Sequence, residues 1–150
     1  MEKKQNGALY LGEFLPYRLS VLSNRISQGI AAQYEERFQL SLPEWRVMAV
    51  VGEEPELSAG QVADRTAMDK VAVSRAVNKL IDAGRLERKF SPEDKRRSVL
   101  TLSDSGIEIY KQVVPIALNY EADIIEKLSD NEFNTLNSLL MKLEAIQLKT

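Results

Sequence analysis

The sequence predicts a mainly α-helical fold that carries one short β-hairpin. Apolar residues recur at intervals of three and four over most of the 150 residues, which is the spacing of one face of a helix. Ser-x-x-Glu/Gln capping boxes begin at Ser41, Ser58 and Ser129 and mark the starts of helices. Between residues 85 and 102, two strand-like stretches flank a charged turn that contains Pro92, and this pattern is typical of a hairpin.

The first predicted helix covers about residues 8–38. Pro16 lies near its beginning and is expected to kink the helix or to delay its start, because proline lacks an N–H group and its ring clashes with the preceding turn. The apolar stripe of this helix consists of Leu15, Leu19, Leu22, Ile26 and Ile30.

The next helices are shorter. Ser41 begins one that runs to about residue 51, and Ser58 begins one that runs to about residue 66. Asp69 can cap a third helix that runs to residue 83, because its carboxylate accepts hydrogen bonds from free N–H groups of the first turn. Gly84 is expected to end it, since glycine readily adopts the left-handed conformation. The inward-facing positions of this third helix are Val73, Val77, Leu80 and Ile81.

A hairpin and two helices complete the chain. Residues 85–90 and 98–102 are predicted strands, with the turn at residues 91–97 between them. The chain is then predicted to be helical from residue 103 to about residue 128, with a bend at Pro115, and again over residues 130–148.

Length and composition indicate a single domain over residues 1–150. With 44% hydrophobic and 28% charged residues, the chain has the balance of an ordinary globular protein. No apolar run approaches the roughly 20 residues that a membrane span requires, and the first residues are too polar for a signal peptide. We therefore expect a cytoplasmic protein that has no membrane partner.

Cysteine and histidine are both absent. Disulfides, thiol chemistry, Cys/His zinc sites and imidazole catalysis are therefore excluded. The sequence also lacks a nucleophile elbow, a phosphate-binding loop and paired catalytic carboxylates. We expect no enzymatic activity, no metal and no cofactor.

Charge is distributed unevenly along the chain. The net charge is −2, but residues 65–97 hold ten of the 20 basic residues and only five acidic ones, so this window carries +5 and the remainder −7. A basic segment within an acidic protein is expected where one face binds phosphate and the rest does not.

Residues 41–102 have the order helix, helix, helix, strand, charged turn, strand, which is the connectivity of a winged helix-turn-helix. In such a module the third helix enters the major groove of DNA. The positions of this helix that face away from the core are Lys70, Val71, Ser74, Arg75 and Asn78, which makes them candidate DNA contacts. The alternative is a solvated helical face with no ligand.

The turn concentrates positive charge. Lys95, Arg96 and Arg97 follow Asp94 directly, and Asp94 is close enough along the chain to orient the guanidinium of Arg96. A wing of this kind can reach the minor groove. A hairpin tip that serves only solubility is the alternative.

Four segments share a pattern with a known family of proteins: VSRAVNKL at residues 73–80, AGRLER at 83–88, DKRR at 94–97 and LTLSDSG at 100–106. They resemble the MarR (multiple antibiotic resistance regulator) family. The resemblance implies that Asp94 and Arg96 form the wing pair, with Arg96 in the minor groove, and that Ser74 and Arg75 lie on the recognition helix. Arg85 departs from the family pattern, which usually has an apolar residue after this glycine.

The flanking helices, residues 8–40 and 103–150, carry apolar stripes that a module of about 60 residues cannot bury by itself. The resemblance implies that they form a two-fold homodimer, so these are the predicted dimerisation helices. Packing of the three helices against one another within one chain is the alternative.

The resemblance also implies a small aromatic or anionic ligand that binds between the dimerisation helices and the DNA module and lowers DNA affinity. Tyr17, Arg18, Trp45 and Arg46 lie on the segments that would line such a pocket. The alternative is that these aromatic residues belong to the core, where Trp and Tyr at helical spacing are usually found.

The sequence thus predicts a homodimeric transcriptional regulator, expected to be a repressor, that binds a pseudo-palindromic site in double-stranded DNA and is released by a small ligand. Two alternatives stay open. One is a winged helix that binds another protein and not DNA, and the other is a small enzyme that needs no metal.

Overall fold

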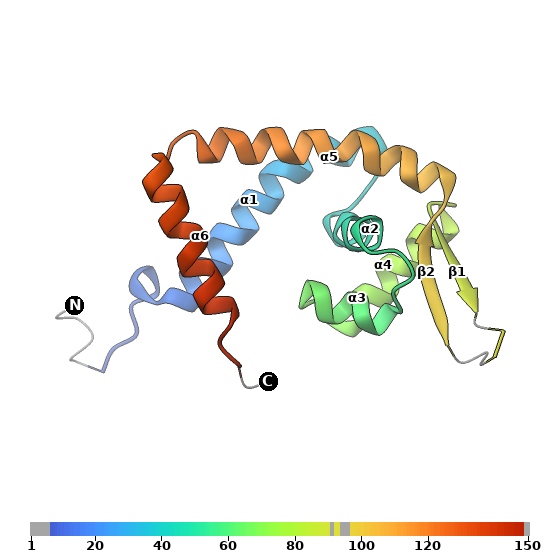
Figure 1. Cartoon of the computed structure of the whole chain (residues 1–150), viewed down its shortest axis with the longest axis horizontal. Helices are drawn as coiled ribbons and strands as arrows, with labels where there is room; N and C mark the ends of the chain where they lie inside the picture. The colour runs from blue at the N-terminus through green and yellow to red at the C-terminus, as the bar shows by residue number, and fades with distance from the viewer. Residues whose placement is uncertain (1–6, 91, 94–96, 149–150) are drawn as a thin grey trace. The chain divides into compact units, whose positions relative to one another are not determined.

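In the computed structural model, which describes residues 7–90, 92–93 and 97–148, the chain folds into helices and one antiparallel hairpin (Figure 1). The predicted mainly α-helical fold with a hairpin is confirmed. A short 3₁₀ helix, Leu11–Glu13, precedes the longer elements. These are α1 Leu15–Phe38, α2 Leu42–Glu53, α3 Ala59–Thr66, α4 Lys70–Asp82, β1 Leu86–Phe90, β2 Ser98–Leu102, α5 Asp104–Ile125 and α6 Asp130–Glu144.

Three of the helices begin with the predicted capping boxes. At α3, the hydroxyl of Ser58 accepts a hydrogen bond from the backbone N–H of Gln61 at 3.1 Å, and the Gln61 amide oxygen accepts one from the backbone N–H of Ser58 at 2.9 Å. The same reciprocal pairs begin α2 at Ser41 and α6 at Ser129. They satisfy backbone donors that have no partner inside the helix.

The N-terminal end of α1 differs from the prediction. The helix begins at Leu15, with Pro16 in its first turn, and not near residue 8. Proline is well tolerated there because the first N–H groups of a helix have no partner within it. Of the two effects expected of Pro16, the delayed start is therefore the one observed.

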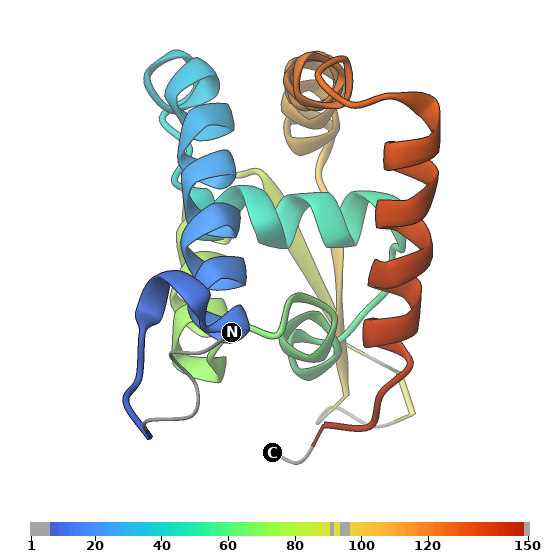
Figure 2. The same ribbon diagram turned by 90° about the vertical axis from the view of Figure 1, so that its left-hand side faces the viewer.

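The core of residues 1–114, the first of two compact units, lies where α2, α3 and α4 pack together with β2. Figure 2 shows α2 crossing this module, with α3 seen nearly end-on below it. The fully buried side chains of these elements include Val47, Met48, Val51, Val62, Val73, Val77, Leu80 and Leu100. The predicted inward face of α4 is thus buried, although Ile81 is only half-buried.

Backbone pairing fixes the hairpin to this core. Leu86 pairs with Leu102 and Phe90 with Ser98, while the N–H of Leu100 donates to the carbonyl of Leu57 at 2.7 Å, before α3. Of β1, only Leu86 is buried. The outer end of the hairpin therefore extends away from the core.

Arg85 stands between α4 and β1, and its contacts explain a charged residue at this position. Gly84 ends α4 with φ +75°, and the guanidinium of Arg85 then reaches back to donate to the carbonyl groups of Phe38 and Gln39 at the end of α1. A cation at a helix C-terminus satisfies free carbonyl groups and opposes the negative end of the helix dipole. The local packing therefore uses the charge of Arg85.

The second unit, residues 115–150, contains the later part of α5 and all of α6. No residue of α6 is buried, and α6 ends at Glu144, four residues before the predicted end at residue 148. Its exposed apolar side chains are Leu136, Leu139, Leu140, Met141 and Leu143. Over the described residues, no helix combines the length and apolar character needed to cross a membrane.

Candidate nucleic-acid interface

Helix α4 presents a face to solvent that opposes its buried face. Val73, Ala76, Val77 and Leu80 point into the core. The five predicted contact residues, Lys70, Val71, Ser74, Arg75 and Asn78, are all exposed. Because they occur at the spacing i, i+1, i+4, i+5 and i+8, they share one side of the helix. The structure therefore brings all five together on a single convex surface.

The first turn of α4 is suited to contact an anion. Asp69 caps it by accepting a hydrogen bond from the backbone N–H of Ala72 at 3.3 Å. Lys70 and Val71 are the first two helical residues, so they lie where free N–H groups and the positive end of the helix dipole point outward.

Two basic residues of the segment 65–97 already bind other groups of the protein. Arg65 forms a bidentate ion pair with Glu54, with distances of 3.0 and 3.2 Å between the guanidinium nitrogens and the carboxylate oxygens, and this pair lowers the pKa of Glu54. Arg85 is held by the end of α1. In the described part of the chain, no ion pair holds Lys70, Arg75 or Lys79.

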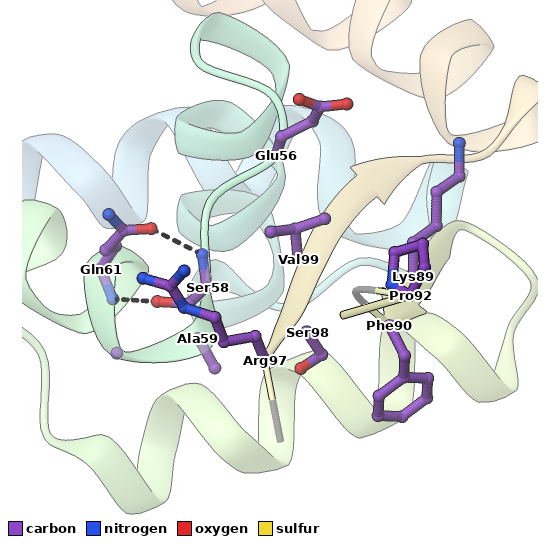
Figure 3. A pocket seen from close by; sticks show the side chains of 11 residues that line it. Glu56, Ser58, Ala59, Gln61, Lys89, Phe90, Pro92, Arg97, Ser98 and Val99 are labelled. Atoms are coloured by element: carbon purple, nitrogen blue, oxygen red, sulfur yellow. Dashed lines mark hydrogen bonds between the residues drawn. The ribbon is translucent and has the colours of Figure 1, made fainter. Parts of the chain in front are cut away.

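A groove of about 910 Å³ separates the hairpin from the start of α3. Figure 3 shows its lining, in which Lys89 and Arg97 come from the hairpin and Ser58 and Gln61 from the α3 cap. Both cations are exposed. The sequence did not identify Lys89 or the cap of α3 as candidate site residues. Lys89 was included only as one of the ten basic residues between residues 65 and 97.

The predicted wing residues are only partly described. Arg97 lies directly before β2, is exposed and lines the groove. Asp94, Lys95 and Arg96 lie outside the described residues, so the orientation of Arg96 by Asp94 stays a prediction.

The predicted ligand residues divide into two groups. Trp45 packs between Tyr34 and Tyr110, with ring centroids 5.9 and 6.0 Å away. Arg46 donates to the hydroxyl of Ser27 at 3.2 Å. These residues, except Tyr110, line a cavity of about 130 Å³ together with Ile30 and Leu42.

Tyr17 and Arg18 do not line this cavity. They lie in the exposed first turns of α1. Tyr34, which does line it, was missed by the sequence analysis, although it continues the apolar stripe of Ile26 and Ile30 by one more turn.

Tyr34 is the least solvated polar group at this cavity. Its side chain is 0% exposed, and no hydrogen-bond partner for its hydroxyl exists among the described residues. Burial, together with the neighbouring carboxylate of Glu35, raises the pKa of Tyr34 to about 12, although the charge of Arg46 acts to lower it. The hydroxyl is therefore a neutral donor that lacks an acceptor.

Comparison with known proteins supports a DNA-binding module. The profile of the MarR family matches residues 38–97, which hold α2 to β1 and the turn. A regulatory protein of Thauera aromatica, whose name assigns it to the hcr operon, is 29% identical over 97 residues, which are 65% of this chain and 58% of that protein. The HTH-type transcriptional regulator TcaR of Staphylococcus aureus is 26% identical over 119 residues, or 78% of each chain.

The fold also agrees with that of solved transcriptional regulators. A crystal structure of a MarR/EmrR family transcriptional regulator from Acinetobacter sp. ADP1 superimposes with a TM-score of 0.82 at 27% identity, covering 91% of this chain and 96% of that one. Its winged helix-turn-helix, its basic face on α4 and these similarities support a transcriptional regulator of the MarR type, a class of proteins that bind DNA.

Proposed function

We propose that this regulator binds a pseudo-palindromic operator as a homodimer and represses transcription from it. In this proposal each α4 enters one major groove and each hairpin follows the adjacent backbone. The two half-sites would be separated by one helical turn, about 34–36 Å, because a two-fold dimer places its recognition helices on one side of the duplex. The proposal includes no catalytic activity.

The outward face of α4 carries this proposal. It combines cations for phosphate with the side chains of Ser74, Arg75 and Asn78, which match base edges in the major groove. A surface that only maintained solubility would not require an amide and a hydroxyl beside the cations on one helical face.

Unburied apolar surface supports the homodimer. Leu136, Leu139, Leu140 and Leu143 form a stripe along α6 at helical spacing, and each is at least 37% exposed. In the other unit, exposed apolar side chains gather before and within α1, at Leu9, Leu11, Phe14, Leu15, Leu19 and Leu22. Patches of this extent are usually covered by a partner, and the proposed partner is a second copy of the chain.

Selection from random duplex DNA tests the operator. We expect one symmetric sequence to be enriched and Arg75→Ala to weaken its binding by about tenfold or more, because a bidentate contact to a base contributes about 1–3 kcal/mol. Arg65→Ala is the matched control, since that guanidinium is paired with Glu54 and its loss should leave affinity nearly unchanged. If no DNA shifts at any concentration, a protein-interaction module becomes the better description.

The cavity beside Trp45 favours a second element of the function, which is release by a small ligand. We propose that it takes a single-ring aromatic anion, with the carboxylate at Arg46 and Tyr34 and the ring against Trp45. Its 130 Å³ is close to the size of cavities of about 150 Å³ that admit a benzene ring.

Tyr34→Phe separates a ligand-binding role from a structural one. The substitution removes a buried hydroxyl that has no partner, so thermal stability should stay the same or rise. Affinity for benzoate-like anions, measured by calorimetry, should fall, and so should their ability to release DNA. Equal ligand affinity in both proteins would remove Tyr34 from the site.

A further inference from the structure

We propose that Val71 recognises the C5-methyl group of thymine in the major groove, and that each half-site therefore contains one thymine read by methyl contact. This inference rests on the proposed function and names a base that the recognition helix prefers.

Val71 is an apolar residue that the fold leaves largely exposed. Its side chain is 55% exposed, while its neighbours on the inner face, Val73 and Val77, are at 1% and 0%. Among the described residues of the module, residues 41–102, only Val71 and Phe90 are large apolar side chains with this degree of exposure. A β-branched residue also disfavours a helix slightly, so local helix stability does not explain it.

The position of Val71 places it among side chains that can read bases. It is the second residue of α4, and the N-terminal residues of a recognition helix lie nearest the base edges. Ser74 and Arg75 follow at i+3 and i+4, where side chains on a helix are about 5–6 Å apart. Lys70 precedes it and can hold a phosphate. Val71 therefore lies between a backbone anchor and two polar base readers.

The chemistry of the groove leaves one matching group. Valine neither donates nor accepts a hydrogen bond, and the C5-methyl of thymine is the apolar group that the base edges present in the major groove. Opposite a cytosine, valine would remove water from the N4 amino group and offer no acceptor in exchange, which is costly. Thymine is therefore favoured over cytosine at this position.

The rigidity of Val71 strengthens this contact. In a helix, valine occupies mainly one χ1 rotamer, so its two methyl groups have a nearly fixed direction before DNA is bound. A contact made by a rigid side chain loses little conformational freedom on binding. A longer side chain such as leucine or methionine would lose more.

The test removes one methyl group from the DNA and one contact from the protein. In the sequence obtained by selection, each thymine is replaced in turn by uracil, which keeps every hydrogen-bonding group and lacks only the methyl. We expect one position per half-site at which uracil weakens binding by about fourfold, or about fifteenfold when both half-sites are changed. Val71→Ala should bind the thymine and uracil duplexes about equally at that position.

Methylated cytosine provides a second, independent test of the methyl contact. When the same base pair is changed to C·G, adding a C5-methyl to the cytosine should improve binding by the wild-type protein and not by Val71→Ala. Ser74→Ala is the matched control, because it changes the same face of α4 and should keep the full methyl effect. Since Val71 is exposed, the alanine variant should melt normally.

The outcomes distinguish this inference from the proposed function. A selected operator that shows no methyl effect, or shows the same effect in Val71→Ala, overturns the assignment of Val71 and leaves operator binding intact. Failure to enrich any sequence overturns the proposed function, and the inference falls with it.

Discussion

Gly106 is a residue at which the fold leaves no room for a side chain. It lies in the first turn of α5, is buried, and a Cβ there would overlap the carbonyl oxygen of Arg85. That oxygen belongs to the backbone between α4 and β1, and it also accepts a hydrogen bond from the N–H of Ser103, directly before α5, at 3.1 Å. It cannot move aside as a flexible side chain could.

We expect Gly106→Ala to destabilise the protein by about 1–3 kcal/mol, as overpacking usually does. Gly60→Ala is the control, since a Cβ there meets only the Ser58 hydroxyl at 3.9 Å and alanine is the better helix former. Urea denaturation of both variants measures the difference. Equal midpoints would mean that the start of α5 adapts more easily than its packing indicates.

At the scale of single elements, the groove between the hairpin and α3 predicts a dependence on salt. Lys89 and Arg97 are exposed on its wall. If each contacts one phosphate, replacing either by alanine should lower the slope of log affinity against log salt by about one per contact, and by about two in a symmetric dimer. The same is expected of Arg96, which lies outside the described residues.

The salt series needs a charge-matched control, and Arg65→Ala provides it because Arg65 is already paired with Glu54. Its slope should equal that of the wild type. Slopes unchanged in both Lys89→Ala and Arg97→Ala would remove the groove from the DNA interface, whatever their effect on affinity at one salt concentration.

The cap of α6 predicts a dependence on pH. Hydrogen bonds from Ser129 lower the pKa of Glu132 below its ordinary value of 4.5. A carboxyl group whose pKa is lower in the folded state stabilises the fold above its unfolded pKa and loses this effect as pH falls through its folded pKa. Stability should therefore decline below about pH 4.5, in part through Glu132.

Glu132→Gln isolates this contribution, because the Ser58–Gln61 box at α3 shows that glutamine completes the same cap. The variant should keep α6 helical and lose less stability than the wild type between neutral and acidic pH. Parallel pH profiles from thermal melts would assign the acid sensitivity to other carboxylates.

The helix starts that have a cap in the sequence were predicted closely. The hydrogen-bonding groups that begin α2, α3, α4 and α6 are local, so four residues of sequence suffice to find them. The start of α1 and the end of α6 lack such signals. Apolar periodicity alone extended both helices too far, because it continues past the point where the backbone hydrogen bonds stop.

The candidate site was also predicted only in part. The exposed face of α4 follows from its buried face, since the helical repeat fixes one from the other. The groove was not predictable, and of the cavity only Trp45 and Arg46 were predicted, because each of the two joins segments far apart in the chain. Ser27 and Arg46, for example, meet across 19 residues.

For the whole molecule, the apolar stripe of α6 predicts a dimer at micromolar concentration, and sedimentation equilibrium should give twice the chain mass of 16.9 kDa. Leu140→Glu should weaken association, because it places a charge in the stripe of apolar side chains. Ser138→Glu, on the opposite side of the helix by the helical repeat, is the matched control. A wild-type protein that sediments as a monomer would contradict the proposal.

The hydrogen bonds from Arg85 to the end of α1 also set an order of events during synthesis. A ribosome extends the chain by about 5–20 residues per second, so Arg85, which follows Phe38 by 47 residues, is made about 2–10 s later. Until then, the last carbonyl groups of α1 have only water as a partner, and the helix end frays. The nascent chain therefore cannot make these two hydrogen bonds at the end of α1 until the base of the hairpin has been translated.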